Sequence, residues 1–176
     1  MIDFVRYIVE ALLSLAVFVM MARLLLQLTR ADFRNPLAQA IVQLTNPLIV
    51  PLRRVLPPIG KVDTASVVAV LLVAALEVSV QHRGPWIDLL DWLDALLRHI
   101  ARMLLSIYLY GIILYALLSM IAPGGYSPLQ SVLASLCEPV LRPFRRIIPP
   151  ISGLDLSPLW ATLIILALLN VPGMWR

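Results

Sequence analysis

Four long apolar segments constrain this chain more than any other feature of its sequence. They cover residues 7–28, 64–80, 103–122 and 158–171. The hydrocarbon core of a bilayer is about 30 Å thick, and a helix needs about 20 residues to cross it. Backbone groups in hydrocarbon must bond within the chain, and no segment alternates like a barrel strand, so we predict four transmembrane helices. The fourth segment is short for a full span.

The composition supports this prediction. Hydrophobic residues make up 61% of the 176 residues and charged residues 14%, whereas soluble domains are about 25% charged. A soluble protein of this size could not bury so much apolar surface in one core. The first apolar run is not followed by a small-x-small cleavage site, so we interpret it as a retained helix rather than a signal peptide.

Two proline- and arginine-rich linkers between the spans match each other without a gap, 92 residues apart. Pro47, Pro51, Arg53, Arg54, Pro57, Pro58, Ile59 and Asp63 recur as Pro139, Pro143, Arg145, Arg146, Pro149, Pro150, Ile151 and Asp155. Such a shared pattern indicates a tandem duplication. Because each copy contains two spans, both copies enter the membrane with the same polarity, which gives a parallel repeat.

The duplication predicts an all-α membrane protein made of two helical hairpins. The first repeat covers residues 1–84 and the second residues 103–176, with an amphipathic connector over 85–102. Each hairpin carries a short interfacial segment between its spans, at about 36–62 in the first repeat and 128–155 in the second.

Apolar residues within these interfacial segments recur with helical spacing. The two stripes are Leu37, Ile41, Leu44, Leu48, Leu52 and Val55, then Leu129, Leu133, Leu136, Val140, Phe144 and Ile147. Prolines within the stripes remove backbone donors and should break or kink the helix. We therefore expect two short amphipathic pieces that lie in the interface rather than a further span.

This arrangement resembles the YggT family, also called YlmG, of small bacterial and plastid membrane proteins. The match rests on Asn46-Pro47-x-x-x-Pro51-x-Arg53-Arg54-x-x-Pro57-Pro58-x-Gly60-x-x-Asp63 and on its second copy, Glu138-Pro139 through Asp155 with Ser157-Pro158. The second copy departs at Ser152, where the first has Gly60. The resemblance implies a non-enzymatic inner-membrane or thylakoid protein. It also implies links to osmotic stress, to ion homeostasis, to division-associated gene neighbourhoods and to the assembly of membrane components.

The distribution of basic residues predicts the orientation. The side with the two linkers holds nine of them: Arg23, Arg30, Arg34, Arg53, Arg54, Lys61, Arg142, Arg145 and Arg146. The opposite side holds five: Arg6, Arg83, Arg98, Arg102 and Arg176. Because basic residues favour the cytoplasmic side, we predict cytoplasmic linkers and periplasmic termini in a bacterial inner membrane.

Arginines of the linkers are the candidate contact residues. Arg53, Arg54, Arg142, Arg145 and Arg146 could bind anionic lipid headgroups or an acidic partner protein, because each basic residue near such a surface contributes about 1 kcal/mol. The alternative is that they only fix topology.

Asp63 and Asp155 each lie just before an apolar helix and ten residues after the first arginine of a pair. The favoured role is an N-cap or a partner for the helix dipole, with Ser157-Pro158 as cap and first-turn proline. The alternative is an ion pair that holds the linker to the helix start.

Three charged residues inside the apolar segments are candidates for a transport pathway: Glu10, Arg23 and Glu77. Each lies within a turn or two of a helix end, so we favour snorkelling of these long side chains to the surface. None of them has an equivalent in the other repeat, although a symmetric pore would use both copies.

Other chemistry is not indicated. His82 and His99 lack a second ligand at helical spacing, and the single cysteine, Cys137, excludes an intrachain disulfide. We find no nucleophile–base pair, phosphate loop or basic run with aromatics, so we predict no enzyme, cofactor, metal or nucleic acid. The favoured hypothesis is a non-catalytic scaffold or assembly factor, and the alternative is an oligomeric channel or transporter for potassium or osmotic balance.

Overall fold

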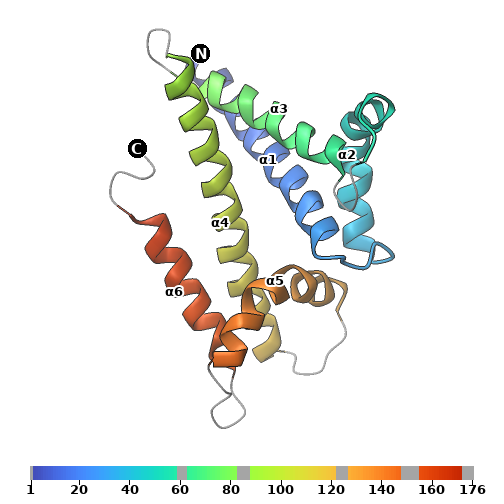
Figure 1. The fold of residues 1–176 in the computed structure, drawn as a ribbon, viewed down its shortest axis with the longest axis vertical. Coiled ribbons are helices and arrows are strands. Elements are labelled where there is room, and N and C mark those ends of the chain that lie inside the picture. Colours follow the sequence, from blue (N-terminus) through green and yellow to red (C-terminus); the bar gives the residue numbers. More distant parts are fainter. Residues whose placement is uncertain (1, 59–62, 83–87, 122–126, 148–154, 172–176) are drawn as a thin grey trace. The chain divides into compact units, whose positions relative to one another are not determined.

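The computed structural model describes residues 2–58, 63–82, 88–121, 127–147 and 155–171. These residues form six helices (Figure 1): α1 (Ile2–Leu28), α2 (Pro36–Val55), α3 (Thr64–Gln81), α4 (Leu89–Ile121), α5 (Pro128–Ile147) and α6 (Ser157–Leu169). Within the described ranges the chain is all-helical, as the sequence predicts.

Three of the helices described are long and apolar enough to cross a membrane, over Asp3–Leu28, Thr64–Gln81 and Leu89–Ile121. The fourth predicted span corresponds to α6, an apolar helix of 13 residues. At 1.5 Å per residue α6 is about 20 Å long, which is shorter than the hydrocarbon core.

Helix α4 joins two segments that the sequence analysis had separated. The connector from Leu89 onward continues without interruption into the third apolar segment, so that α4 has 33 residues. Neither glycine nor proline occurs between Leu89 and Gly111, and the Asp94–Arg98 ion pair, four residues apart, supports the first turns of the helix. The physical reason is that nothing in the backbone ends the helix there.

The prolines of the interfacial segments do not break their helices. Helix α2 runs through Pro47 and Pro51, and α5 runs through Pro139 and Pro143. Each proline forfeits one backbone hydrogen bond and bends a helix rather than ending it when the rest of the segment packs well. Figure 1 shows α5 changing direction along its length.

The chain forms two compact units. The first contains Met1–Leu24 and Ile41–Met103, and the second contains Leu25–Ala40 and Leu104–Arg176. The core of the first unit joins α1, α3 and the start of α4 through Val17, Ala74, Val78 and Leu96. The small residues on the buried face of α3 let these helices approach closely.

In the second unit α4, α5 and α6 share a core. It contains Leu109, Ile112, Cys137, Leu141, Ala161 and Ile165. Gly111 of α4 lies against α5, where an added Cβ would be 3.7 Å from Cys137 Sγ.

The matching apolar stripes of α2 and α5 have different environments. In α5 the stripe packs inward, with Leu133 and Leu136 buried. Of the equivalent positions in α2, Ile41 is half-buried and Leu44 is 72% exposed. At their last residues the two stripes agree, because Val55 is 78% exposed and Ile147 is 77% exposed. The two stripes therefore differ most at Leu44 and Leu136.

Candidate functional site

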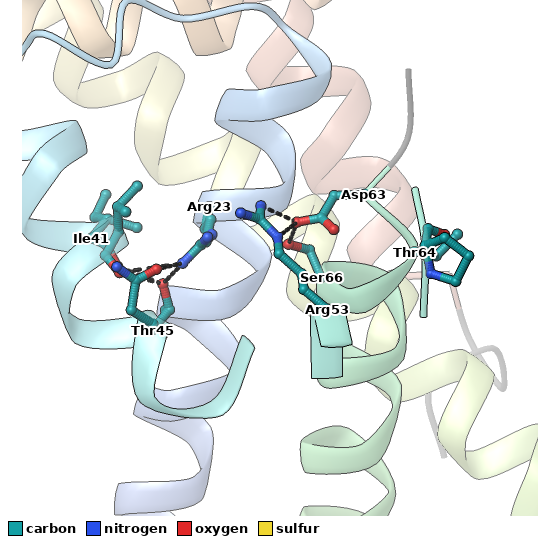
Figure 2. Close-up of polar contacts among 10 residues, drawn as sticks. Arg23, Ile41, Thr45, Arg53, Asp63, Thr64 and Ser66 are labelled. Atoms are coloured by element: carbon teal, nitrogen blue, oxygen red, sulfur yellow. Dashed lines mark hydrogen bonds and ion pairs between the residues drawn. The ribbon is translucent and has the colours of Figure 1, made fainter. Parts of the chain in front are cut away.

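The end of α2 is tied to the start of α3 by an arginine–aspartate ion pair. Arg53 donates from Nε to Asp63 Oδ2 over 3.1 Å and also from Nη2. Ser66 donates its hydroxyl to the same oxygen over 2.6 Å. Figure 2 shows Arg53 and Ser66 converging on Asp63, whose side chain is 4% exposed.

The second copy repeats this ion pair. Arg145 Nε lies 2.8 Å from Asp155 Oδ2, and the Asp155 side chain is more open, at 39% exposed. Both arginines therefore reach the aspartate ten residues later. The ion-pair alternative from the sequence is the one that the geometry supports at both positions.

The two aspartates differ in their contacts with the backbone at the start of the next helix. Asp63 occupies the N-cap position of α3, but its side chain makes no capping hydrogen bond to the backbone, because Arg53 and Ser66 hold it instead. Asp155 does accept the backbone N–H of Ser157 through Oδ1, over 2.9 Å. Asp63 therefore occupies the predicted N-cap position without a capping hydrogen bond. The N-cap of α6 is Leu156 and Ser157 is the first residue of that helix, so the predicted caps at Asp155 and Ser157 are wrong.

Both carboxyl groups are held ionised. Burial acts to raise the pKa of Asp63, but hydrogen bonds from Arg53 and Ser66 and the charges of Arg53 and Arg23 outweigh it, so the pKa lies below its usual value. At Asp155 burial likewise opposes ionisation, and hydrogen bonds from Ser157 and Arg145 again lower the pKa.

Arg23 of α1 joins the first site from inside an apolar helix. Its Nη1 atom donates to Thr45 Oγ1 over 2.6 Å, to Asn46 Oδ1 over 3.0 Å and to the carbonyl oxygen of Val42 over 3.2 Å. Figure 2 shows its guanidinium turned toward Thr45 of α2. Arg23 is 4% exposed, so the snorkelling prediction is wrong here, because polar groups of α2 provide partners inside the unit.

The equivalent group in the second unit uses different residues. Tyr115 replaces Arg23 and Glu138 replaces Asn46. Arg145 donates from Nη1 to Glu138 Oε2 over 2.6 Å and from Nη2 to the hydroxyl of Tyr115 over 3.5 Å. Arg142 lies 3.5 Å from the other oxygen of Glu138. The two sites thus share an arginine–aspartate pair but differ in the charges around it.

The second arginine of each pair is exposed. Arg54 and Arg146 are the last basic residues of α2 and α5, and no hydrogen bond or ion pair within the described residues includes either side chain. The first arginine of each pair therefore holds the linker to the next helix, whereas the second makes no side-chain contact of this kind within the described residues.

Two prolines of the first linker follow the end of α2. Pro57 accepts a hydrogen bond at its carbonyl oxygen from Thr64 Oγ1 over 2.7 Å. Pro58 lies beside it and is exposed, whereas Pro149 and Pro150 lie outside the described residues.

A second polar group lies among α1, α3 and α4 of the first unit. Glu77 has no exposed surface. Its Oε1 accepts hydrogen bonds from Ser14 Oγ and, over 2.9 Å, from Gln81 Nε2, and its Oε2 lies 2.9 Å from His99 Nε2. Snorkelling is therefore wrong for Glu77 as well. Glu10 instead pairs with Arg6 one turn earlier, over 2.8 Å.

Sequence reasoning missed the partners of Arg23 and Glu77 because all of them except Gln81 come from other helices. The one available signal was the aligned difference between Asn46 and Glu138 within otherwise matching linkers. Within the described residues, no group of three or more His, Cys, Asp or Glu side chains could hold a metal ion.

The second unit also contains an apolar cavity of about 740 Å³ between α4 and α6. Leu117, Met120 and Leu159 are among its lining residues, and Tyr115 and Asp155 line it as well. Asp155 of the second arginine–aspartate pair therefore lines this cavity together with mainly apolar side chains.

Comparison with known proteins gives one family. The family model described as CCB3/YggT matches residues 2–82 and 94–175. An uncharacterized protein of Pseudomonas aeruginosa is 39% identical over 164 residues, which cover 89% of this chain and 82% of that protein. YggT of Escherichia coli K12, also named as uncharacterized, is 29% identical over 182 residues, 96% of each chain.

A plastid relative matches a shorter stretch. YlmG homolog protein 2, chloroplastic, of Arabidopsis thaliana is 44% identical over 43 residues, 24% of this chain and 17% of that protein. No solved structure matches the chain.

Proposed function

The chain belongs to the CCB3/YggT family, and we propose that it is a non-catalytic scaffold or assembly factor of the bacterial inner membrane that contacts anionic lipid or partner proteins through its proline–arginine linkers. Membership of the family confirms the resemblance inferred from the sequence. The relatives carry no enzyme name.

The proposal includes four membrane spans arranged as two parallel hairpins. Helices α1, α3 and α4 are long enough to cross a bilayer, and α6 would cross by thinning the lipid around it. Large apolar side chains are exposed along these helices, including Leu12 at 61%, Leu72 at 54% and Leu163 at 49%. Soluble proteins do not expose contiguous apolar surface on this scale, so lipid is the fitting solvent.

The proposal rests on the different contacts of the two arginines in each pair. Arg53 and Arg145 are held by aspartates, which leaves Arg54 and Arg146 exposed at the ends of amphipathic helices. An arginine at a helix end beside apolar surface suits the phosphates of a lipid headgroup or an acidic protein surface. We place both linkers on the cytoplasmic side, following the basic-residue bias.

The cavity of the second unit supports the lipid version of the proposal. Its lining is mainly apolar and includes Asp155 and Tyr115, which both contact Arg145. A cavity of this kind fits an acyl chain whose headgroup lies near the basic end of α5.

The experiment is an exchange of Arg54 and Arg146 for Gln in the full chain. Both structural ion pairs remain, so insertion and thermal stability should stay unchanged. Recovery of phosphatidylglycerol or of crosslinked partner proteins should fall by about thirtyfold, for two lost contacts of about 1 kcal/mol each. The control is Arg102→Gln, which removes a positive charge from α4 and leaves the Asp94–Arg98 ion pair in place; losses are compared per arginine removed. Unchanged recovery in the linker variant, or an equal loss in the control, would count against the proposal.

The channel alternative makes a different prediction. Glu77 would lie on an ion path, and potassium flux into liposomes containing the purified protein would fall on Glu77→Gln or Arg23→Gln. The full set of hydrogen bonds to Glu77 favours a structural role instead. Flux that depends on either residue would overturn the scaffold proposal.

A further inference from the structure

Arg23 carries a buried charge without a carboxylate partner. Its side chain is 4% exposed, its three acceptors are a hydroxyl, an amide oxygen and a backbone carbonyl, and no ion pair between described residues includes it. A buried guanidinium that lacks a counter-ion is unfavourable, so the first site is electrostatically incomplete as it stands.

The Nε and Nη2 atoms of Arg23, which together can bind an anion, make no hydrogen bond to a described residue. All three hydrogen bonds come from Nη1, and neither Nε nor Nη2 donates to any described residue. These two atoms form the fork that binds a carboxylate or phosphate through two parallel hydrogen bonds. Asp63, whose charge interacts with Arg23, is already held by Arg53 and Ser66.

The second copy shows what completes such a site. There Arg142 and Arg145 meet two carboxylates, those of Glu138 and Asp155. The first site has one carboxylate, that of Asp63, which forms an ion pair with Arg53 and not with Arg23, because the residue equivalent to Glu138 is the neutral Asn46. The second site therefore contains the anion that the first one lacks.

We propose that the first unit binds one phosphate-class anion on the Nε–Nη2 edge of Arg23, supplied by a phospholipid headgroup or by free phosphate. The inference rests on the proposed function and deepens it by naming a specific anion site beside the linker. Phosphate is the class that fits, because Arg23 lies one to two turns before the end of α1 at Leu28, where headgroup phosphates are the abundant anions.

The decisive variant is Asn46→Asp. It supplies an internal carboxylate where Asn46 Oδ1 already accepts from Arg23, so the chain should fold with its charge satisfied. Native mass spectrometry of the full chain in neutral detergent would count bound phosphatidylglycerol against phosphatidylcholine. Retention of phosphatidylglycerol should fall by about tenfold, as for the loss of one charge-assisted contact. Gln43→Glu, which adds the same charge at an exposed position of α2, should retain it as the original chain does.

A second measurement distinguishes the sources of the anion. Inorganic phosphate that raises the melting temperature of the original chain, but not of the Asn46→Asp chain, would support free phosphate as the ligand. Selective retention of phosphatidylglycerol without that shift would support a lipid. Absence of both effects would overturn the inference.

The linker variant separates this inference from the proposed function. If Arg54→Gln with Arg146→Gln loses lipid while Asn46→Asp keeps it, the inference fails and the proposed function stands. If only Asn46→Asp loses lipid, the Arg23 site stands and the role of the exposed linker arginines fails.

Discussion

Glu77 and His99 are 22 positions apart in the sequence, yet Glu77 Oε2 lies 2.9 Å from His99 Nε2. Glu77 has no exposed surface, and its other oxygen accepts from Ser14 and Gln81. The carboxylate thus joins α1, α3 and the first part of α4. A buried polar group satisfied in this way specifies which helices meet, which apolar packing alone does not.

Removing this carboxylate should destabilise the first unit. Glu77→Ala leaves the donors of Ser14 and Gln81 without an acceptor, and we expect a loss of about 2–3 kcal/mol in the free energy of unfolding. Glu77→Gln should cost less, because its amide can donate to His99 while its oxygen still accepts. Thermal unfolding in detergent measures both variants.

Glu10→Ala is the control for Glu77→Ala. It removes a carboxylate from α1, where Glu10 is partly exposed and pairs with Arg6 one turn away. We expect a change within about 0.5 kcal/mol. Equal losses for the two variants would contradict the role assigned to the Glu77 group.

The two arginine–aspartate pairs should differ in strength although their chemistry is the same. Asp63 is 4% exposed and Asp155 is 39% exposed. We expect Asp63→Ala to cost about 2–3 kcal/mol, because it leaves Arg53 without its ion-pair partner and removes a negative charge that acts on the buried Arg23. Asp155→Ala should cost about 1 kcal/mol or less, since Glu138 remains beside Arg145.

Chemical unfolding of each variant in the same detergent gives the comparison. Adding Arg53→Ala to Asp63→Ala should restore part of the loss, because the unpaired cation is then removed as well. A larger loss at Asp155 than at Asp63, or no coupling between Arg53 and Asp63, would contradict the proposed ion pair.

The ion pair at Asp63 should make stability depend on pH only in acid. Its pKa is lower in the folded chain than in the unfolded chain, so the folded chain binds the proton more weakly. The stabilisation is complete at pH values above the unfolded pKa, which is about 3.9, and is lost as the pH falls through the lower folded value. The melting-temperature difference between the original chain and Asp63→Asn should be constant from pH 7 to about pH 4.5 and shrink below that.

Much of the fold followed from hydropathy and repetition. The start of α3 at Thr64 and the start of α6 at Ser157 lie within one residue of the predicted segments, because an aspartate and a Ser-Pro pair mark the helix entrances. The length of α4 was missed because its first half is amphipathic and its second half is apolar. No glycine or proline lies between the two halves to end the helix. The absence of helix-breaking residues therefore predicts one helix, although the polarity changes along it.

The candidate site was only partly visible in the sequence. The ten-residue spacing of Arg53 and Asp63 suggested their ion pair, because the repeat preserves it. The sequence does not predict the burial of Arg23 and Glu77, since all their partners except Gln81 lie on other helices, 19 or more positions away. When each helix is considered alone, charged residues such as these are predicted to reach the surface. A second helix that packs against the first can supply the hydrogen bonds that permit their burial.

Cys137 should resist alkylation until the second unit unfolds. It has no exposed surface and lies in the core formed by α4, α5 and α6, and burial raises its pKa to about 12. At pH 7.5 the thiolate fraction is therefore about a thousandfold below that of an ordinary cysteine. Maleimide labelling followed by mass spectrometry should be slower by at least that factor than labelling of Gln39→Cys in a Cys137→Ser chain, where residue 39 is exposed.

Labelling in denaturing detergent should make the two rates equal, because both thiols are then in water. A native rate for Cys137 within tenfold of the control would mean that α5 leaves the core readily, and the packing of Gly111 against Cys137 would not describe the protein in its membrane.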